Sequence, residues 1–418
     1  MTYINSLELK LSFKIISSMF SILFRFIQVL LLSIRHMSNP DLPIIKEGWK
    51  GNPMVKNSFV NEDKPSDMNM IEFMKWRLYK NPQKQEKKED TFKVGFVKNE
   101  SFPESENDMI IWLGHASFFI RLGGVTFLTD PSYFSFPFRT RKVPVPCSID
   151  RFKNVDYVVV SHMHHDHADM RSLRKIFKDN DKTEALVPLR GGMYMKHFTK
   201  RYQEAGWYQQ YNTKPEVEVF FLPTFHWSRL HVFDNNKTLW GSFLIRANGK
   251  TIYFGGDTAF GNHFSEIAKL FPEIDYAIMP VGGYKPRSIM KVAHIAPDEA
   301  AQAAAIMNTK HFIPMHYGTY PIGQEPSGEP IREIKRMESE GEMIGCVNCL
   351  SVGEEFLIDS ENGEQITFAA CGEAASPANG YDCVREYLTK ETPEFGAGVE
   401  EVSGVRNPEL PVDEMVAK

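Results

Sequence analysis

Apolar and polar positions divide the chain into four stretches. Residues 109–358 carry short apolar runs, each ending in polar residues or glycine, which predicts buried strands in a folded domain. Before them come a largely apolar N-terminal segment (1–36) and a polar arm (37–108) that contains one helix-like spacing at 68–79. Residues 359–418 are rich in Glu, Gly and Ala, which predicts an acidic tail without a core of its own.

Within residues 109–358 most of the apolar runs are four or five residues long and contain β-branched or aromatic residues, as buried strands do. The predicted strands are 110–113, 118–122, 125–128, 157–160, 219–222, 251–254, 276–279 and 312–315. Gly123-Gly124 predicts a hairpin turn. Residues 170–178 and the Ala-rich run 297–306, which has Pro297 in its first turn, predict helices. The fold class is therefore α/β.

The N-terminal segment is aliphatic from Phe13 to Ile34, and its main polar residues recur along one helical face. They are Lys14, Ser18, Ser21, Arg25 and Gln28. This pattern predicts an amphipathic helix at a membrane surface, and hence a peripheral protein of the cytoplasmic face or a cytoplasmic one. A charge in mid-segment argues against a lipid-exposed span. A signal anchor, a helix docked on the domain, and a true start at Met37 are the alternatives.

Length, composition and charge limit the domain organisation and the class of partner. With 418 residues the chain exceeds a typical single core, so appendages to the central domain are expected. Hydrophobic residues make up 42% and charged residues 24%, which is ordinary for a globular protein. The net charge of −5 argues against nucleic acid as a partner, because such binders are normally basic.

Potential metal ligands follow several of the predicted strands. Four occur within six residues after the run 157–160, namely His162, His164, Asp166 and His167. Loops at strand ends are where α/β sheets place their sites, and imidazole and carboxylate suit Zn²⁺ or a similar ion. Three more ligand types, His226, Asp257 and His316, also each come after a predicted strand. The recurrence predicts one convergent metal site.

Further motifs accompany these ligands. They are WLGHAS (112–117), LTDP (128–131), SHMHHDH (161–167), PTFHWSR (223–229), LWGS (239–242), GGDT (255–258), PVGGYKPR (280–287), MKVAHIAPDEA (290–300) and IPMHYGTY (313–320). With them the chain resembles the metallo-β-lactamase superfamily, and within it the N-acylphosphatidylethanolamine-hydrolysing phospholipase D enzymes and their bacterial relatives. The resemblance covers roughly residues 109–355. It implies an αββα sandwich in which residues 109–358 are the catalytic domain.

The resemblance also implies two divalent metal ions, with Zn²⁺ expected. One ion would be held by His162, His164 and His226, the other by Asp166, His167 and His316, and Asp257 would bridge the two. A hydroxide shared by the ions would attack the substrate, and Asp166 and Asp257 would help to orient it. Asp130 is expected to fix the metal loop through hydrogen bonds, and His115 to be structural.

His294 lies in a motif whose histidine, in the resembling enzymes, faces the active-site cavity and helps to bind or protonate the substrate phosphate. The preceding residue is commonly Gln in the phospholipases, whereas this chain has Ala293. Trp227, Tyr284 and Arg287 lie in the shared motifs and are candidate substrate contacts.

Three functions follow from these motifs. The first is a phospholipase D type phosphodiesterase that attacks phosphorus in N-acylphosphatidylethanolamine-like phospholipids, with a membrane surface as partner and a homodimer left open. The aromatic residues Phe134, Phe136 and Phe138 suit such a substrate, although such residues are as often core. The second is a soluble hydrolase of a sugar-phosphate lactone or another small ester. The third is a non-catalytic scaffold, against which the complete ligand set argues.

Overall fold

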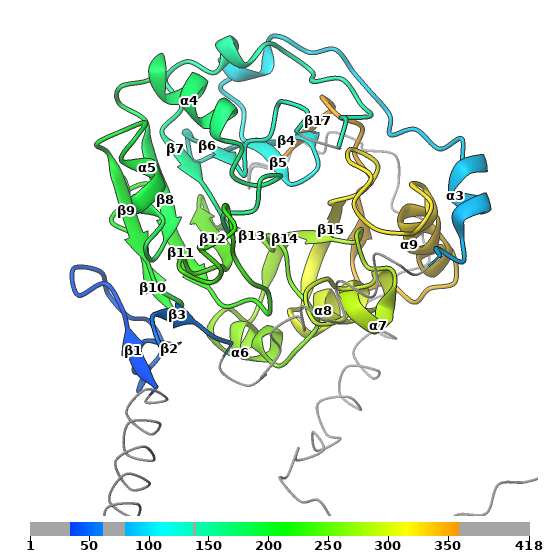
Figure 1. The fold of residues 1–418 in the computed structure, drawn as a ribbon. Helices are drawn as coiled ribbons and strands as arrows, with labels where there is room; N and C mark the ends of the chain where they lie inside the picture. The colour runs from blue at the N-terminus through cyan, green and yellow to red at the C-terminus, as the bar shows by residue number, and fades with distance from the viewer. Residues whose placement is uncertain (1–33, 62–79, 137–138, 359–418) are drawn as a thin grey trace, which may run out of the picture. The chain divides into compact units, whose positions relative to one another are not determined.

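The computed structural model describes residues 34–61, 80–136 and 139–358 (Figure 1). The interfacial helix predicted near the N-terminus, the helix expected at 68–79, Phe138 and the acidic tail lie outside these ranges. Across the three ranges, no helix combines the length and the apolar character that crossing a membrane requires.

One seven-stranded sheet has the order β17-β4-β5-β6-β7-β8-β9. Its strands are β4 (Met109–Gly114), β5 (Ser117–Leu122), β6 (Val125–Thr129), β7 (Tyr157–Val159), β8 (Glu184–Pro188), β9 (Tyr202–Ala205) and β17 (Glu355–Leu357). The pairs from β17 to β6 are antiparallel, and those from β6 to β9 are parallel. The β5–β6 turn uses Gly123 and Gly124 at φ 59° and 74°, a backbone conformation that favours glycine and matches the predicted hairpin.

A second seven-stranded sheet has the order β10-β11-β12-β13-β14-β15-β16. Its strands are β10 (Gln209–Gln210), β11 (Glu218–Leu222), β12 (Ser242–Ala247), β13 (Lys250–Phe254), β14 (Ile274–Pro280), β15 (Thr309–Met315) and β16 (Cys346–Val347). The parallel part runs from β13 to β16. A small antiparallel sheet precedes both and consists of β1 (Arg35–Met37), β2 (Asn52–Val55) and β3 (Ser58–Phe59).

The two large sheets pack face to face and helices cover their outer sides (Figure 1). Phe118 of the first sheet meets Phe254 of the second in the shared core, with ring centroids 6.4 Å apart. The helices are α3 (Lys84–Glu89), α4 (Met170–Lys178), α5 (Gly192–Met195), α6 (His263–Leu270), α7 (Arg287–Met290), α8 (Pro297–Ile306) and α9 (Glu329–Ser339), with short 3-10 turns at Phe102–Glu104 and Ile149–Arg151. Helix α4 buries one face on the first sheet, and α6, α8 and α9 pack on the second. The predicted αββα order is confirmed.

Every strand and both helices predicted in the central domain are confirmed; seven of the eight strands are longer by one to three residues, and both helices have the predicted bounds. The polar arm also contains helix α3, which buries none of its residues. This part of the arm contacts α9 and the preceding loop, because Gln83 Nε2 donates to Glu329 Oε2 (2.7 Å) and Gly328 N donates to Asp90 Oδ2 (2.7 Å).

Candidate metal centre

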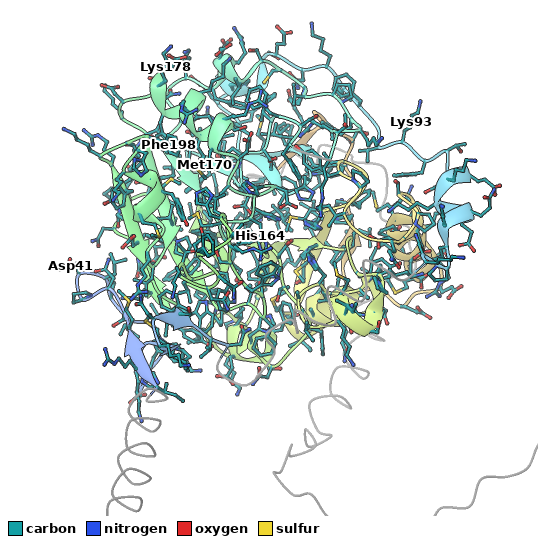
Figure 2. The ribbon with its side chains drawn as sticks, in the orientation of Figure 1. Asp41, Lys93, His164, Met170, Lys178 and Phe198 are labelled. Carbon is teal, nitrogen blue, oxygen red and sulfur yellow. The ribbon has the colours of Figure 1, made fainter. Side chains whose placement is uncertain are left out.

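The seven predicted ligands converge where the two sheets meet. Four follow β7 of the first sheet, whereas His226, Asp257 and His316 follow β11, β13 and β15 of the second. Together with His115, which was not a predicted ligand, they form two groups, and within each group the ligand atoms lie within 4.8 Å of one another. The first group is His162, His164, His226 and Asp257, and the second is His115, Asp166, His167 and His316. In Figure 2 His164 lies near the centre of the view.

In the first group three imidazole nitrogens face one another. His164 Nδ1 lies 2.8 Å from His162 Nε2 and 3.2 Å from His226 Nε2. Asp257 Oδ2 completes the group at 3.8 Å from His226 Nε2 and 4.0 Å from His162 Nε2. Neutral imidazoles offer only one proton each, so this crowding of ring nitrogens suits a cation better than a hydrogen-bond network.

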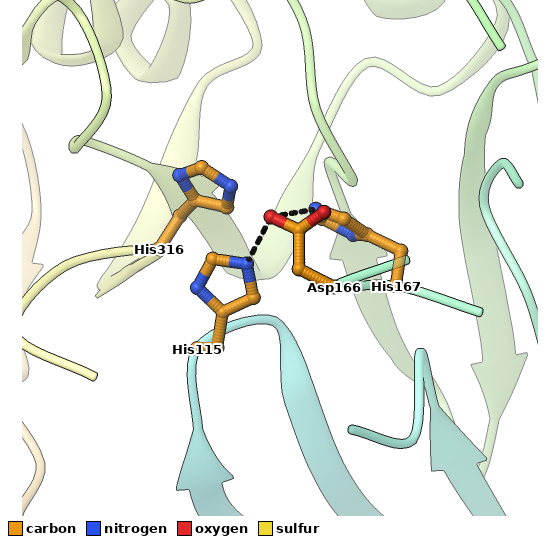
Figure 3. A group of neighbouring side chains, drawn as sticks. All are labelled: His115, Asp166, His167 and His316. Carbon is orange, nitrogen blue, oxygen red and sulfur yellow. Dashed lines mark hydrogen bonds and ion pairs between the residues drawn. The ribbon is translucent and has the colours of Figure 1, made fainter. Parts of the chain in front are cut away.

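In the second group the Asp166 carboxylate lies between two histidines (Figure 3). Asp166 Oδ2 is 3.1 Å from His115 Nε2 and 4.0 Å from His167 Nε2. Asp257 reaches this group as well, with Oδ2 3.3 Å from His167 Nε2 and Oδ1 3.1 Å from His316 Nε2. Asp257 is therefore the one carboxylate among the described residues that faces both groups at these distances.

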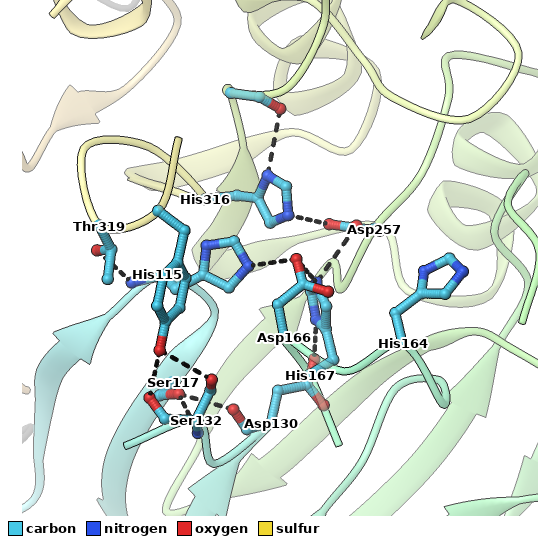
Figure 4. A network of polar contacts seen from close by, with 12 residues as sticks. His115, Ser117, Asp130, Ser132, His164, Asp166, His167, Asp257, His316 and Thr319 are labelled. Carbon is cyan, nitrogen blue, oxygen red and sulfur yellow. Dashed lines mark hydrogen bonds and ion pairs between the residues drawn. The ribbon is translucent and has the colours of Figure 1, made fainter. Parts of the chain in front are cut away.

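Hydrogen bonds at Nδ1 fix the tautomers of four histidines, two of which, His167 and His316, are drawn in Figure 4. His226 and His316 donate Nδ1–H to the carbonyl oxygens of Ala293 (2.8 Å) and Gly282 (3.2 Å). His167 Nδ1 donates to Asp130 Oδ2 (2.7 Å). Ser161 Oγ donates to the same oxygen (2.5 Å), so it accepts from His162 Nδ1 at 2.9 Å. In all four rings Nε2 is therefore the nitrogen that faces the centre, and in the neutral ring it carries a lone pair.

These lone pairs point into the centre without donors to meet them. His167 Nε2, His316 Nε2 and Asp257 Oδ1 are buried and have no hydrogen-bond partner among the described residues. Two acceptors 3.1 Å apart, such as His316 Nε2 and Asp257 Oδ1, repel unless a proton or a metal cation lies between them. The donor set thus fits divalent metal ions, and its mixture of imidazole and carboxylate suits zinc.

Electrostatics favour the metal-binding states of His164, His226 and Asp257. Burial lowers the pKa of His164 and His226 to about 3, so both rings are neutral near pH 7, as metal binding requires. Burial opposes ionisation of Asp257, but positive charge on the neighbouring His316 and His167 outweighs it and holds the pKa of this carboxyl well below its usual range. A charged carboxylate is consequently present between the two groups. In return, Asp257 and Asp130 overcome burial and raise the pKa of His167 well above the usual histidine value, so a proton competes with a metal ion at this ring.

A family model for the β-lactamase superfamily domain matches residues 126–317, the part of the chain that carries all seven ligands. A metal-dependent hydrolase of Caldivirga maquilingensis is 30% identical over 219 residues, which cover 51% of this chain and 85% of that protein. The chain belongs to the metallo-β-lactamase superfamily. It is thus a metal-dependent hydrolase by family, and imidazole–carboxylate centres of the kind described above suit that chemistry.

Two further proteins are similar to this chain over larger shares of its length. An N-acyl-phosphatidylethanolamine-hydrolyzing phospholipase D of Caenorhabditis elegans is 28% identical over 313 residues, covering 69% of this chain and 83% of that enzyme. A metallo hydrolase of Ignicoccus hospitalis superposes with a TM-score of 0.46 at 20% identity, covering 60% of this chain and 99% of that structure.

His115 lies closer to this metallo-β-lactamase centre than the sequence indicated. We expected a structural residue, but Nε2 contacts Asp166 and the ring lies 4.1 Å from that of His316. Its carbonyl oxygen accepts from His316 N at 3.2 Å, which joins the two sheets at the centre. The feature of the sequence that could have indicated this position is the WLGHAS motif, which places the histidine in the tight β4–β5 turn.

Three of these residues have left-handed backbone conformations: His115 (φ 58°), Asp130 (φ 33°) and His316 (φ 65°). Residues other than glycine rarely adopt positive φ, and such strain persists only where the surroundings enforce it. All three make hydrogen bonds within the centre that depend on this backbone direction. The strain is consistent with a site whose geometry is set by chemistry rather than by stability.

The remaining predicted site residues fall into two classes. Trp227 lies against His164, with ring centroids 4.3 Å apart, and His294 Nδ1 lies 3.8 Å from Asp257 Oδ2. Tyr284 and Arg287 instead turn their polar groups toward partners in the protein. The Tyr284 hydroxyl donates to Glu329, and Arg287 donates to the His294 carbonyl oxygen (2.8 Å) and to Glu299 (2.6 Å). Arg287 therefore supports the position of His294.

Asp130→Asn is expected to destabilise the fold by about 3–5 kcal/mol, the usual cost of breaking a buried charged network. Asp130 is fully buried and accepts from Ser161 N, Ser161 Oγ and His167 Nδ1. The amide of an asparagine would turn an N–H group toward at least one of these donors, and two donors that face each other cannot form a hydrogen bond. Asn tolerates positive φ as Asp does, so the substitution adds no backbone strain to the expected loss of stability. Urea unfolding measures the stability, and a competitive titration with a metal indicator should show a 10–100-fold weaker affinity.

Asp150→Asn is the matched control for this prediction. Asp150 is exposed and binds Lys175 and the Ser148 hydroxyl at the surface, where solvent screens such ion pairs and they contribute little to stability. A similar loss in both variants would contradict the assigned role of Asp130.

Proposed function

We propose that the chain is a phosphodiesterase of the phospholipase D type that hydrolyses N-acylphosphatidylethanolamine-like phospholipids with two zinc ions. The observation that carries the proposal is the placement of His294. Its Nδ1 is buried, has no hydrogen-bond partner among the described residues, and lies 3.8 Å from the carboxylate shared by both ligand groups. A group in this position can bind a substrate oxygen without being needed as a ligand. Similarity to the worm phospholipase supports the substrate class.

Each part of the centre has a chemical role in this reaction. Divalent ions, when bound, lower the pKa of water and neutralise charge on a phosphoryl group. His162, His164, His226, Asp166, His167, His316 and Asp257 would hold them. The water oxygen bonds to phosphorus, the bond from phosphorus to the ethanolamine oxygen breaks, and that oxygen leaves with a proton. Phosphatidate and an N-acylethanolamine are the products.

His294 would position the phosphoryl group. Burial lowers its pKa to about 3, so the ring is neutral and contributes one N–H donor. Its backbone is fixed from both sides, since His294 N donates to Met290 O (2.8 Å) and Arg287 holds its carbonyl oxygen. A pre-positioned donor of this kind stabilises the charge that develops on a phosphoryl oxygen.

An apolar wall beside the centre suits acyl chains. Phe136 packs on Tyr320 with ring centroids 4.9 Å apart, and Tyr320 packs on His115 at 5.1 Å. The Tyr320 hydroxyl bonds to the carbonyl oxygen of Phe134 (3.0 Å), so the wall is held in place. Half-buried aromatics next to a polar centre are typical of sites for ligands with both apolar and charged parts.

The purified chain is expected to contain two divalent ions, mainly zinc, and to lose its activity on dialysis against a chelator. Elemental analysis gives the metal content, and adding back zinc should restore turnover. Active, unchelated protein that holds no more than trace metal would rule the proposal out.

The substrate class is tested by assaying one preparation on three substrates: an N-acylphosphatidylethanolamine, phosphatidylcholine, and a sugar-phosphate lactone. In ¹⁸O-water the proposed reaction places the label in phosphatidate, because attack occurs at phosphorus. Label in the N-acylethanolamine, or turnover of the lactone alone, would contradict it. The lactone outcome would favour the small-ester hydrolase, a class compatible with the Caldivirga relative.

A further inference from the structure

Residues 228–236 form a closed loop that begins two residues after His226. Asn236 N donates to Ser228 O (2.8 Å), and Ser228 N donates to Asn236 Oδ1 (3.1 Å). The base of the loop is tied to the metal motif, because Met163 N donates to Ser228 Oγ (3.1 Å). The loop is therefore anchored on the same segment that carries His162 and His164.

The tip of this loop presents two apolar side chains to solvent. The Asp234 carboxylate accepts from the backbone N–H groups of Leu230 and His231 at 2.9–3.3 Å, which closes the turn. Val232 is 78% exposed and Phe233 is 94% exposed. The polar turn holds two adjacent apolar side chains in solvent, where their exposure is unfavourable. This arrangement indicates that the tip contacts a partner.

The two segments at the tip are rich in cationic residues, and a nearby acid, Glu204, shares a hollow with Arg190 and Lys237. The tip contacts α5, because the Tyr194 hydroxyl donates to Asp234 and the Tyr194 ring lies 6.0 Å from His231. Residues 189–201 and 227–238 together contain six cationic side chains and a single acid, Asp234, in a chain whose net charge is −5. The six are Arg190, Lys196, Lys200, Arg201, Arg229 and Lys237.

We propose that Val232 and Phe233 insert into an anionic phospholipid bilayer while the cations of these two segments contact its headgroups. The inference rests on the proposed function, which needs access to a lipid, and it names the surface that meets the leaflet. Apolar burial and attraction between basic residues and anionic lipids are the two terms that bind peripheral proteins. We call residues 189–201 and 227–238 the docking surface.

The location of the docking surface suits delivery of substrate to the centre. Phe233 is seven residues from His226, so even an extended chain would place them within about 25 Å. Trp227 and Leu230 connect the two: Trp227 packs on His164, and Leu230 shares a buried cluster with Met163. In Figure 2 Phe198, within the docking surface, lies on the same side of His164 as Met170.

The first test measures binding of the full-length chain to vesicles of phosphatidylcholine with phosphatidylserine. The double variant Val232→Ser/Phe233→Ser is expected to bind about tenfold or more weakly, because insertion of a Phe and a Val is lost. Lys196→Gln with Lys200→Gln should lose about fivefold per lysine on these vesicles and little on pure phosphatidylcholine.

Phe96→Ser/Val97→Ser is the matched control. It removes a second adjacent pair of exposed apolar residues, at 40% and 44% exposure, from a segment outside the docking surface. The inference predicts vesicle binding close to wild type for this variant. Equal losses in the two double variants would overturn it, since general surface hydrophobicity would then explain the binding.

Hydrogen exchange gives a local measurement that does not depend on other membrane-binding parts of the chain. Amides of residues 231–235 should exchange several-fold more slowly when anionic vesicles are added, and those of 95–98 should not change. Unchanged exchange at 231–235 overturns the inference. So does a wild-type dimer that becomes monomeric in Val232→Ser/Phe233→Ser while vesicle binding is kept, because the occupant is then a second copy of the chain.

These experiments separate the inference from the proposed function. Val232 and Phe233 lie outside the ligand set, so their variant should hydrolyse a dispersed short-chain phosphodiester at the wild-type rate while losing rate on bilayers. If no phosphodiester is hydrolysed by any form of the chain, the proposed function fails, whereas vesicle binding and exchange still decide on the docking surface.

Discussion

Asp257→Asn is expected to lower turnover on the order of a thousandfold or more, beyond the loss typical of one missing hydrogen-bond donor. Asp257 faces His316 and His167 in one group and His226 in the other. An amide keeps the size of the side chain but loses the negative charge that would balance two cations. Metal content should fall below two ions per chain, and the urea midpoint of the chelated protein should change little.

Asp298→Asn makes the same chemical change at an exposed position in the first turn of α8. It should leave both turnover and metal content at the wild-type level. Near-normal rates in Asp257→Asn itself would show that the carboxylate does not serve both groups.

His294→Ala is expected to lower turnover roughly a hundredfold or more while leaving two ions bound. The reason is the placement of Nδ1 beside Asp257 without a hydrogen-bond partner, where it can meet substrate. Its ring also lies 5.5 Å from that of His316, so the geometry permits a ligand role as well. Elemental analysis decides between the two, because only a ligand would take metal with it.

The control for this variant is His165→Ala. His165 lies inside the metal motif but is exposed, so its loss should change the rate by no more than a few-fold. Unaltered turnover in His294→Ala would show that this residue packs beside the centre without contacting the substrate.

The central domain was accessible to sequence reasoning because its strands are short, continuous apolar runs. Nearly the whole length is buried in β4, β6, β7 and β13. These strands therefore appear in the sequence as continuous apolar runs and not as alternating apolar and polar residues. Strands such as β9, with the half-exposed sequence Tyr202–Ala205, carry no such signal and were missed. Helix α9 was missed as well, although its apolar residues Ile331, Ile334 and Met337 recur at the spacing of one helical face.

The identity of the candidate ligands could be predicted for a related reason. Each follows a strand, and strand ends in adjacent sheets meet at one edge. What could not be predicted is how polar groups are oriented. Arg287 occurs in a shared motif that suggested a substrate contact, yet its guanidinium binds Glu299 and the backbone at His294. Such pairings depend on rotamers and loop paths, which periodicity does not encode.

The division of the ligands between the two sheets has a consequence for biosynthesis. His162, His164, Asp166 and His167 leave the ribosome well before His316, whose strand lies beyond β14 of the other sheet. A nascent chain therefore cannot complete the first ligand group before Asp257 is made or the second before His316, and each group needs strands of both sheets. Metal loading would then be a late event that holds the halves together, because an ion that binds only the folded form stabilises it by mass action. Cellular levels of the protein would consequently follow the supply of the metal.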